Sequence, residues 1–183
     1  LEAHQAARAR WPDLILVIAP RHPERVSEVL ELVRAQGWPA IRRSELSGPA
    51  GAGGVIVLDT VGELAQLYAV ADVVFVGGSL VAAGGHNMLE AALKRKPALF
   101  GPHTENFREA AELLVGSGAA VVIDDTPALG RELARLLADP ELRARRGQAG
   151  YEVVAARQGA VRETLALVDR FLAGGGIDGR GAS

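Results

Sequence analysis

The sequence predicts a doubly wound α/β domain, in which helices cover both faces of a parallel sheet. Short apolar runs alternate about six times with segments whose apolar residues recur at helical spacing. This alternation is typical of parallel strands joined by crossover helices. The chain has 183 residues, 49% of them hydrophobic, which is enough to bury one core.

The first half of the chain provides three runs of strand length. The helical pattern of residues 1–11 precedes a predicted strand at Leu14–Ala19. A helix follows, because its apolar residues fall at i, i+3, i+4 and i+7: Val26, Val29, Leu30 and Val33. Short strands are predicted at Ala40–Arg43 and Val55–Leu58, and the second leads into a helix over residues 64–71.

The second half repeats the alternation. Val73–Val76 is rich in β-branched residues and is followed by a glycine-rich turn and a helix around residues 89–93. Strands at Ala98–Phe100 and Ala120–Ile123 precede helices over residues 107–114 and 129–137. Two further helices are expected, at Glu141–Arg157 and Ala160–Leu172.

We expect residues 1–173 to form one domain and residues 174–183 to be a flexible tail, because the tail is rich in glycine and has Ile177 as its large apolar residue. The sequence begins at Leu1 within a helical pattern, so we interpret the chain as one domain of a longer protein.

Composition and charge exclude several classes of function. A net charge of −2 gives no support to a nucleic-acid surface, and the absence of cysteine excludes disulfides and thiolate metal sites. No apolar run approaches the roughly 20 residues that span a bilayer. The sequence lacks an Asp-x-Asp motif and any His-x-x-x-His pair, so we expect no metal, and we expect no cofactor.

The polar loops that follow the strands are the expected site, because ligands bind at the carboxyl ends of parallel strands. In the first loop, Arg21 is placed to bind a phosphate, or it belongs to an ordinary helix start. Pro23 and Glu24 suit the first turn of the next helix. In the second loop, Thr60 and Glu63 have the spacing of a capping box, which we prefer for Thr60. Gly62 would let a flat ligand approach the backbone.

The third loop is the most informative, because two Gly-Gly pairs lie between a strand and a helix. Such a loop suits a phosphate, although it is neither a dinucleotide fingerprint nor a P-loop. Asn87 and Glu90 have capping-box spacing; alternatively, Asn87 helps hold the phosphate and Glu90 accepts hydrogen bonds from ribose hydroxyls. His86 is an anion donor or a structural histidine. In the fourth loop, His103 and Asn106 face a ligand, or Asn106 is the N-cap of the next helix.

These motifs together resemble the 3-deoxy-D-manno-octulosonic acid (Kdo) transferase family. The similarity covers residues 14–172, in motifs whose order and spacing match that family: Arg21–Arg25, Asp59–Leu64, Phe75–Leu80, Gly84–Glu90, Gly101–Phe107 and Gln158–Ala160. Two departures are Met88, where we expect Pro, and Glu105, where we expect an apolar residue that is often Phe. Glu105 places a negative charge near an anion site.

The resemblance implies the C-terminal, Rossmann-like half of a GT-B glycosyltransferase that transfers Kdo from CMP-Kdo to lipid A precursor. The reaction would be inverting and metal-independent, at the cytoplasmic face of the bacterial inner membrane. The catalytic base, the acceptor site and any membrane contact would belong to an N-terminal domain absent from this chain. The chain alone should therefore be inactive.

By motif match, the family resemblance assigns seven residues to CMP-Kdo. Arg21 is assigned to the phosphate and Glu90 to the ribose, and Gly62 and Glu63 to the cytosine pocket. The remaining residues of the site are Gly78, Ser79 and Asn87. The alternatives are another GT-B transferase or an epimerase that uses a UDP-sugar, or a nucleotide-binding module without turnover.

Overall fold

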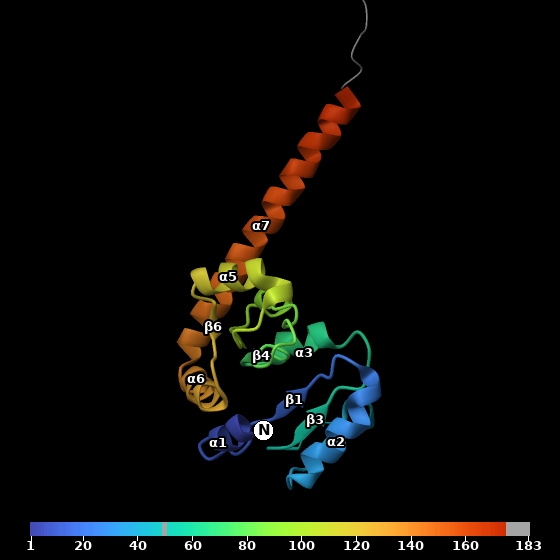
Figure 1. Cartoon of the computed structure of the whole chain (residues 1–183), viewed down its shortest axis with the longest axis vertical. Helices are drawn as coiled ribbons and strands as arrows, with labels where there is room; N and C mark the ends of the chain where they lie inside the picture. Colours follow the sequence, from blue (N-terminus) through green and yellow to red (C-terminus); the bar gives the residue numbers. More distant parts are fainter. Residues whose placement is uncertain (49–50, 175–183) are drawn as a thin grey trace, which may run out of the picture.

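The computed structural model describes the backbone of residues 1–48 and 51–174, and the side-chain environment of residues 1–48 and 51–158. All six predicted strands are present, and every pairing between them is parallel. The strands are hydrogen-bonded as two three-stranded sheets, in the orders β1-β3-β2 and β4-β5-β6 (Figure 1). The parallel α/β class predicted from the sequence is therefore confirmed.

The first sheet consists of β1 (Leu16–Ile18), β3 (Val55–Val57) and β2 (Ala40–Arg42). Helix α2 (Val26–Ala35) connects β1 to β2, and its apolar face packs on the central strand. Val26 and Leu30 meet Val57 there, and all three side chains are buried. The periodicity that predicted this helix thus also identified the face that it buries.

The second sheet consists of β4 (Val74–Val76), β5 (Ala98–Phe100) and β6 (Ala120–Val122). Helix α3 (Leu64–Val70) precedes β4, α4 (Leu89–Leu93) lies between β4 and β5, and α5 (Arg108–Gly116) lies between β5 and β6. Three short 3₁₀ helices occupy loops after strands: η1 (Pro23–Arg25), η2 (Arg43–Glu45) and η3 (Glu105–Phe107). Pro23 opens η1, as the sequence predicted.

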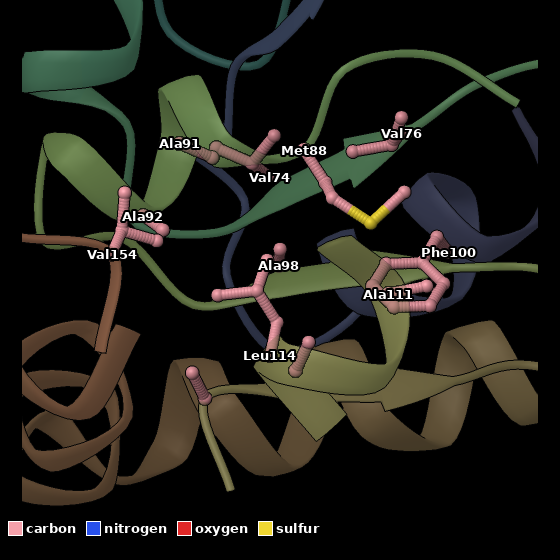
Figure 2. Packing of buried hydrophobic residues seen from close by; sticks show 12 residues of the cluster. Val74, Val76, Met88, Ala91, Ala92, Ala98, Phe100, Ala111, Leu114 and Val154 are labelled. Carbon is pink, nitrogen blue, oxygen red and sulfur yellow. The ribbon is translucent and has the colours of Figure 1, made fainter. Parts of the chain in front are cut away.

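The main core lies between the second sheet and helices α4 and α5 (Figure 2). Phe100, Met88 and Leu114 are its large, fully buried side chains. Burying a side chain of this size stabilises the fold by roughly 1.5–3 kcal/mol. Met88 points toward Phe100 and Val76 in Figure 2, so this departure from the expected proline contributes to the core.

The remaining helices pack on the second sheet and on each other. Helix α1 (Glu2–Arg8) contacts α6 (Thr126–Ala138), and α4 contacts α7 (Pro140–Gly174). Asp125 caps α6 by accepting a hydrogen bond from the amide of Ala128 at 2.6 Å. Figure 1 shows the first part of α7 packed beside α5 and α6, and its C-terminal part projecting away from the rest of the molecule.

The prediction of two closing helices was wrong, because α7 is one continuous helix from Pro140 to Gly174. Gly159 lies within it. A glycine costs a helix only about 1 kcal/mol relative to alanine, so without a proline it does not end the helix. The predicted flexible tail began at Gly174, which is the last residue of α7, and its other residues, 175–183, lie outside the described residues.

Candidate functional site

Loops from both sheets meet at the carboxyl edge of the strands. Arg21, in the loop after β1, lies 3.1 Å from His86, in the loop after β4, measured from Nη1 to Nδ1. The amide of His103, after β5, donates to the carbonyl oxygen of Ser79, after β4, at 2.9 Å. The loops that the sequence identified after β1, β4 and β5 are therefore in contact at the carboxyl ends of their strands.

The contact between Arg21 and His86 determines the protonation of the imidazole. A guanidinium only donates hydrogen bonds, so Nδ1 of His86 is the acceptor and the ring proton is on Nε2. Burial lowers the pKa of His86 below its usual 6.5, and the positive charge of Arg21 lowers this pKa further. The ring is therefore neutral at pH 7, beside the exposed positive charge of Arg21.

The glycine-rich loop after β4 is compact because three of its residues, Gly78, Gly84 and Gly85, adopt a left-handed backbone. Gly78 has a φ of +68°, and a Cβ there would lie 3.2 Å from Nε2 of His86. Gly85 has a φ of +72°, and a Cβ there would lie 3.0 Å from the carbonyl oxygen of His103. The amide of Gly85 donates to the carbonyl oxygen of Gly78 at 2.9 Å and closes the loop. Glycine at these positions thus brings the backbone and the imidazole together.

Ser79 belongs to this loop, and its side chain is fully buried. Its hydroxyl donates to the carbonyl oxygen of Val76 at 2.5 Å and accepts from the amide of Gly101 at 2.8 Å. The hydroxyl therefore joins the ends of β4 and β5. Because the residue has no exposed surface, its place in the site is to support the loop from below.

Asn87 and Glu90 lie side by side at the start of α4. Nδ2 of Asn87 donates to Oε1 of Glu90 at 3.1 Å, and Oδ1 of Asn87 accepts from the amide of Leu89 at 3.0 Å. Helix α4 begins at Leu89 with Met88 as its N-cap, so the reciprocal capping box does not form. The carboxylate of Glu90 is exposed. Its negative charge also acts on Tyr68 of α3: burial is the main cause that raises the pKa of Tyr68, and the charge of Glu90 raises this pKa further.

A second charged cluster follows β2 and β3. Glu63 is partly buried, and its carboxylate accepts from Nη2 of Arg43 at 3.0 Å and from the hydroxyl of Thr60. The predicted capping box of Thr60 and Glu63 is wrong, because α3 begins at Leu64 with Glu63 as N-cap and the hydroxyl binds the carboxylate instead of a helix amide. Gly62, exposed and with a φ of +87°, has open space where a Cβ would stand.

Arg43 and Ser44 also belong to this cluster, and neither was predicted from the sequence. The amide and hydroxyl of Ser44 donate to the carboxylate of Asp59 at 2.9 and 2.5 Å. The hydroxyl is the larger cause of the lowered pKa of Asp59. Both residues directly follow β2, so their position at the carboxyl end of a strand was the signal that could have identified them.

The fourth loop differs from its prediction. Asn106 is not the N-cap of α5, because it lies within η3 and Phe107 takes that position. Its amide instead donates to the carbonyl oxygen of Gly84 at 3.2 Å, and its side chain would collide with a Cβ on Gly84. His103 lies 3.4 Å from the exposed carboxylate of Glu105. The loop therefore packs against the glycine-rich loop.

A surface cavity of about 610 Å³ lies between the fourth loop and α5. Its lining includes Phe100, Pro102, Glu105, Arg108 and Val122. Among the described residues that line it, none belongs to the seven predicted for the site. Those seven residues lie instead in the loops at the carboxyl edge of the strands and at the helix starts that follow them.

In the part of the chain that the structure describes, no helix is long and apolar enough to cross a membrane. No group of three or more His, Cys, Asp or Glu residues there is arranged to hold a metal ion.

The sequence matches curated relatives over nearly all of its length. It is 40% identical over 173 residues to the 3-deoxy-D-manno-octulosonic acid transferase of Haemophilus influenzae, covering 94% of this chain and 40% of that protein. It is 39% identical over 171 residues to the same enzyme of Bordetella pertussis, covering 93% of this chain and 40% of that protein. The chain thus spans about 40% of the length of these relatives. No protein-family model matches the sequence.

The fold also matches a solved structure, the C-terminal CMP-Kdo binding domain of WaaA from Acinetobacter baumannii. The TM-score is 0.71 at 27% sequence identity, and the match covers 83% of this chain and 97% of that one. The parallel α/β fold and the matched relatives agree. The chain belongs to the 3-deoxy-D-manno-octulosonic acid transferase family and corresponds to the C-terminal domain of its members.

Proposed function

We propose that this chain is the CMP-Kdo-binding domain of a glycosyltransferase that transfers Kdo to lipid A precursor in lipopolysaccharide assembly. The observation that carries the proposal is the contact between Arg21 and His86, which brings a guanidinium from the loop after β1 to the glycine-rich loop after β4. A guanidinium beside a glycine-rich helix start is the chemistry that a phosphate requires. The matched Acinetobacter domain, described as CMP-Kdo binding, supports the choice of nucleotide sugar.

The phosphate of CMP-Kdo would bind between Arg21 and the loop that contains Gly78. Arg21 is exposed and retains further N–H groups beyond the one directed at His86. Gly78 is partly exposed, and its lack of a Cβ leaves room for the imidazole of His86 beside the backbone of the loop. Ser79 would support this surface from beneath through its bonds to Val76 and Gly101.

The ribose and cytosine would extend toward α4 and α3. Glu90 is a suitable partner for the two ribose hydroxyls, because its carboxylate is exposed and accepts hydrogen bonds only. Asn87 orients that carboxylate from 3.1 Å. Gly62 offers an open backbone surface for a flat base, and Glu63, held by Arg43, is positioned to accept from the exocyclic amine of cytosine.

The transfer itself would use groups outside this chain. A hydroxyl oxygen of the acceptor would form a bond to the anomeric carbon of Kdo, and the bond from that carbon to the phosphate oxygen would break, so that CMP leaves with the bonding electrons. A carboxylate would take the hydroxyl proton. A single displacement of this kind would invert the anomeric centre. The reaction would need no metal, because Arg21 would balance the charge of the leaving phosphate. The base, the acceptor site and the membrane contact would belong to the part of the relatives that this chain does not span, so the chain alone should not transfer Kdo.

Calorimetric titration of the chain with CMP, UMP and AMP tests the proposal. We expect CMP to bind more tightly than the other two, and Arg21→Met to weaken CMP binding by at least about tenfold, the effect of losing a charged hydrogen bond. Arg25→Met is the matched control, because Arg25 is exposed and pairs with Glu28 on its own segment. Equal affinity for the three nucleotides, or none, would overturn the proposal, and a preference for UMP would favour a UDP-sugar instead.

A further inference from the structure

The bond between Arg21 and His86 connects two parts of the fold that their strand ladders leave separate. Arg21 follows β1 of the first sheet, and His86 follows β4 of the second. Over the described residues, the hydrogen-bonded strand orders β1-β3-β2 and β4-β5-β6 share no pair. The side chain of His86 therefore holds the loop after β1 against the glycine-rich loop.

The imidazole is itself held in a defined orientation. Its Nδ1 accepts from Arg21 at 3.1 Å, while its Nε2 lies over the backbone of Gly78, where a Cβ would be only 3.2 Å away. The neighbouring residue Gly85 is buried, and His86 is partly buried. Nδ1 thus faces the guanidinium, and the other ring nitrogen is covered on one side by the loop.

We propose that His86 is a positioning residue, which orders the guanidinium of Arg21 through Nδ1 for the phosphate of the nucleotide. This inference rests on the function proposed above. An exposed arginine has many rotamers, and ordering such a side chain opposes binding. The bond to His86 imposes that order before the ligand arrives, so the phosphate meets a guanidinium already in place.

The competing role is direct donation from Nε2 of His86 to the phosphate, and two substitutions separate these roles. The side-chain oxygen of asparagine takes the place of Nδ1, and the side-chain nitrogen of glutamine takes the place of Nε2. If His86 positions Arg21, His86→Asn should bind CMP nearly as the wild type does. His86→Gln and His86→Leu should bind it roughly three- to tenfold more weakly, the effect expected for one side chain that must be ordered on binding.

Titration of each variant with CMP and with cytidine locates the effect at the phosphate. We expect the affinity for cytidine to be the same in all His86 variants that retain the wild-type circular dichroism spectrum. In an Arg21→Met background, His86→Leu should change the affinity for CMP by less than about twofold, because a positioning residue acts through the residue that it holds. In an Arg25→Met background, the same change should keep its full effect.

The ring itself gives a measurement that does not depend on CMP. Nitrogen NMR of the histidines should show His86 protonated on Nε2 at pH 7, and Arg21→Met should shift its Nδ1 signal. Three results would each overturn the positioning role. The first is CMP affinity that is retained in His86→Gln and lost in His86→Asn. The others are an additive effect of His86→Leu on CMP affinity in the Arg21→Met background, and an Nδ1 signal that Arg21→Met leaves unchanged. If the wild-type chain binds no CMP, the proposed function fails instead, whatever the NMR result.

Discussion

The hydroxyl of Ser79 accepts a hydrogen bond from the backbone amide of Gly101 at 2.8 Å, in a fully buried position between the ends of β4 and β5. The same hydroxyl donates to the carbonyl oxygen of Val76. One side chain thus fixes the spacing of two loops, since the amide of His103 also binds the carbonyl oxygen of Ser79. The glycine-rich loop rests on this arrangement.

Ser79→Ala should therefore lower stability more than it lowers affinity. The substitution leaves the buried amide of Gly101 without its partner, which costs roughly 1–3 kcal/mol. Urea unfolding measures the loss, and titration of the folded fraction with CMP should give an affinity close to that of the wild type. Ser117→Ala is the control, because Ser117 is only partly buried and donates to one carbonyl oxygen, that of Leu114. An equal loss of stability in both variants would contradict the supporting role of Ser79.

Gly78 and its neighbour Gly77 provide a matched pair. Gly78 has a left-handed backbone with the ring of His86 close to the position of a Cβ, whereas Gly77 has nothing within 4 Å of that position. Gly78→Ala should cost about 1–2 kcal/mol of stability from the backbone conformation, and it should also weaken CMP binding by displacing His86. Gly77→Ala should leave both properties nearly unchanged. Thermal unfolding and calorimetry measure both, and a Gly78→Ala protein that equals Gly77→Ala would refute this reading of the loop.

Glu90→Gln tests the ribose assignment. Glutamine keeps the size of the side chain and its contact with Asn87, but removes the charge. Binding of CMP should weaken roughly tenfold, the effect of losing a charged acceptor, while stability should change little because Glu90 is exposed. The variant should also lose most of its preference for CMP over 2′,3′-dideoxy-CMP. Retention of both the affinity and that preference would exclude Glu90 from the ribose.

Buried histidine makes stability depend on pH. His4 is buried, its Nε2 lies 3.1 Å from the carbonyl oxygen of Leu14, and burial is the main cause that lowers its pKa below 6.5. The pKa of His86 is lowered in the same direction. The unfolded state therefore binds more protons than the folded state just below pH 6.5. The contribution of the two neutral imidazoles to stability is complete above pH 6.5, and it is lost as the pH falls through the folded pKa values.

The free energy of unfolding should consequently decrease between pH 7.5 and pH 5. His4→Gln can still donate to the carbonyl oxygen of Leu14, and it should reduce this pH dependence. The double variant with His86→Asn should reduce it further. Urea unfolding at a series of pH values provides the measurement. A His4→Gln protein with an unchanged slope would show that His4 does not carry the effect.

The strands and most helices were predictable from the sequence, because their apolar residues follow the period of the element that buries them. Val26 and Leu30 illustrate this for α2, where the predicted face is the buried face. Helix starts were less predictable. The residue types of Thr60–Glu63 and Asn87–Glu90 fit capping boxes, but each helix begins later than such a box requires. Thr60 binds Glu63 instead, and Asn87 binds Glu90 as well as the amide of Leu89.

Contacts between distant parts of the chain were beyond sequence reasoning. Arg21 and His86 are 65 positions apart, and nothing in either motif indicates that His86 accepts a hydrogen bond from Arg21. The burial of Ser79 was also hidden, because serine in a glycine-rich loop suggests exposure, whereas here it joins two strands. Arg43 has no motif around it, so its position after β2 was the available signal, and its contact with Glu63 became visible only in the structure.

The most direct test of the account is an amide NMR titration of the assigned chain with CMP. We expect the largest shifts at Arg21, Gly62, Gly78, Asn87 and Glu90, since these residues belong to the proposed binding edge. Residues of the cavity beside α5, such as Ala111 and Val122, should shift little. Shifts centred on that cavity, or no shifts at saturating CMP, would contradict the claim that the loops at the carboxyl edge form the nucleotide site.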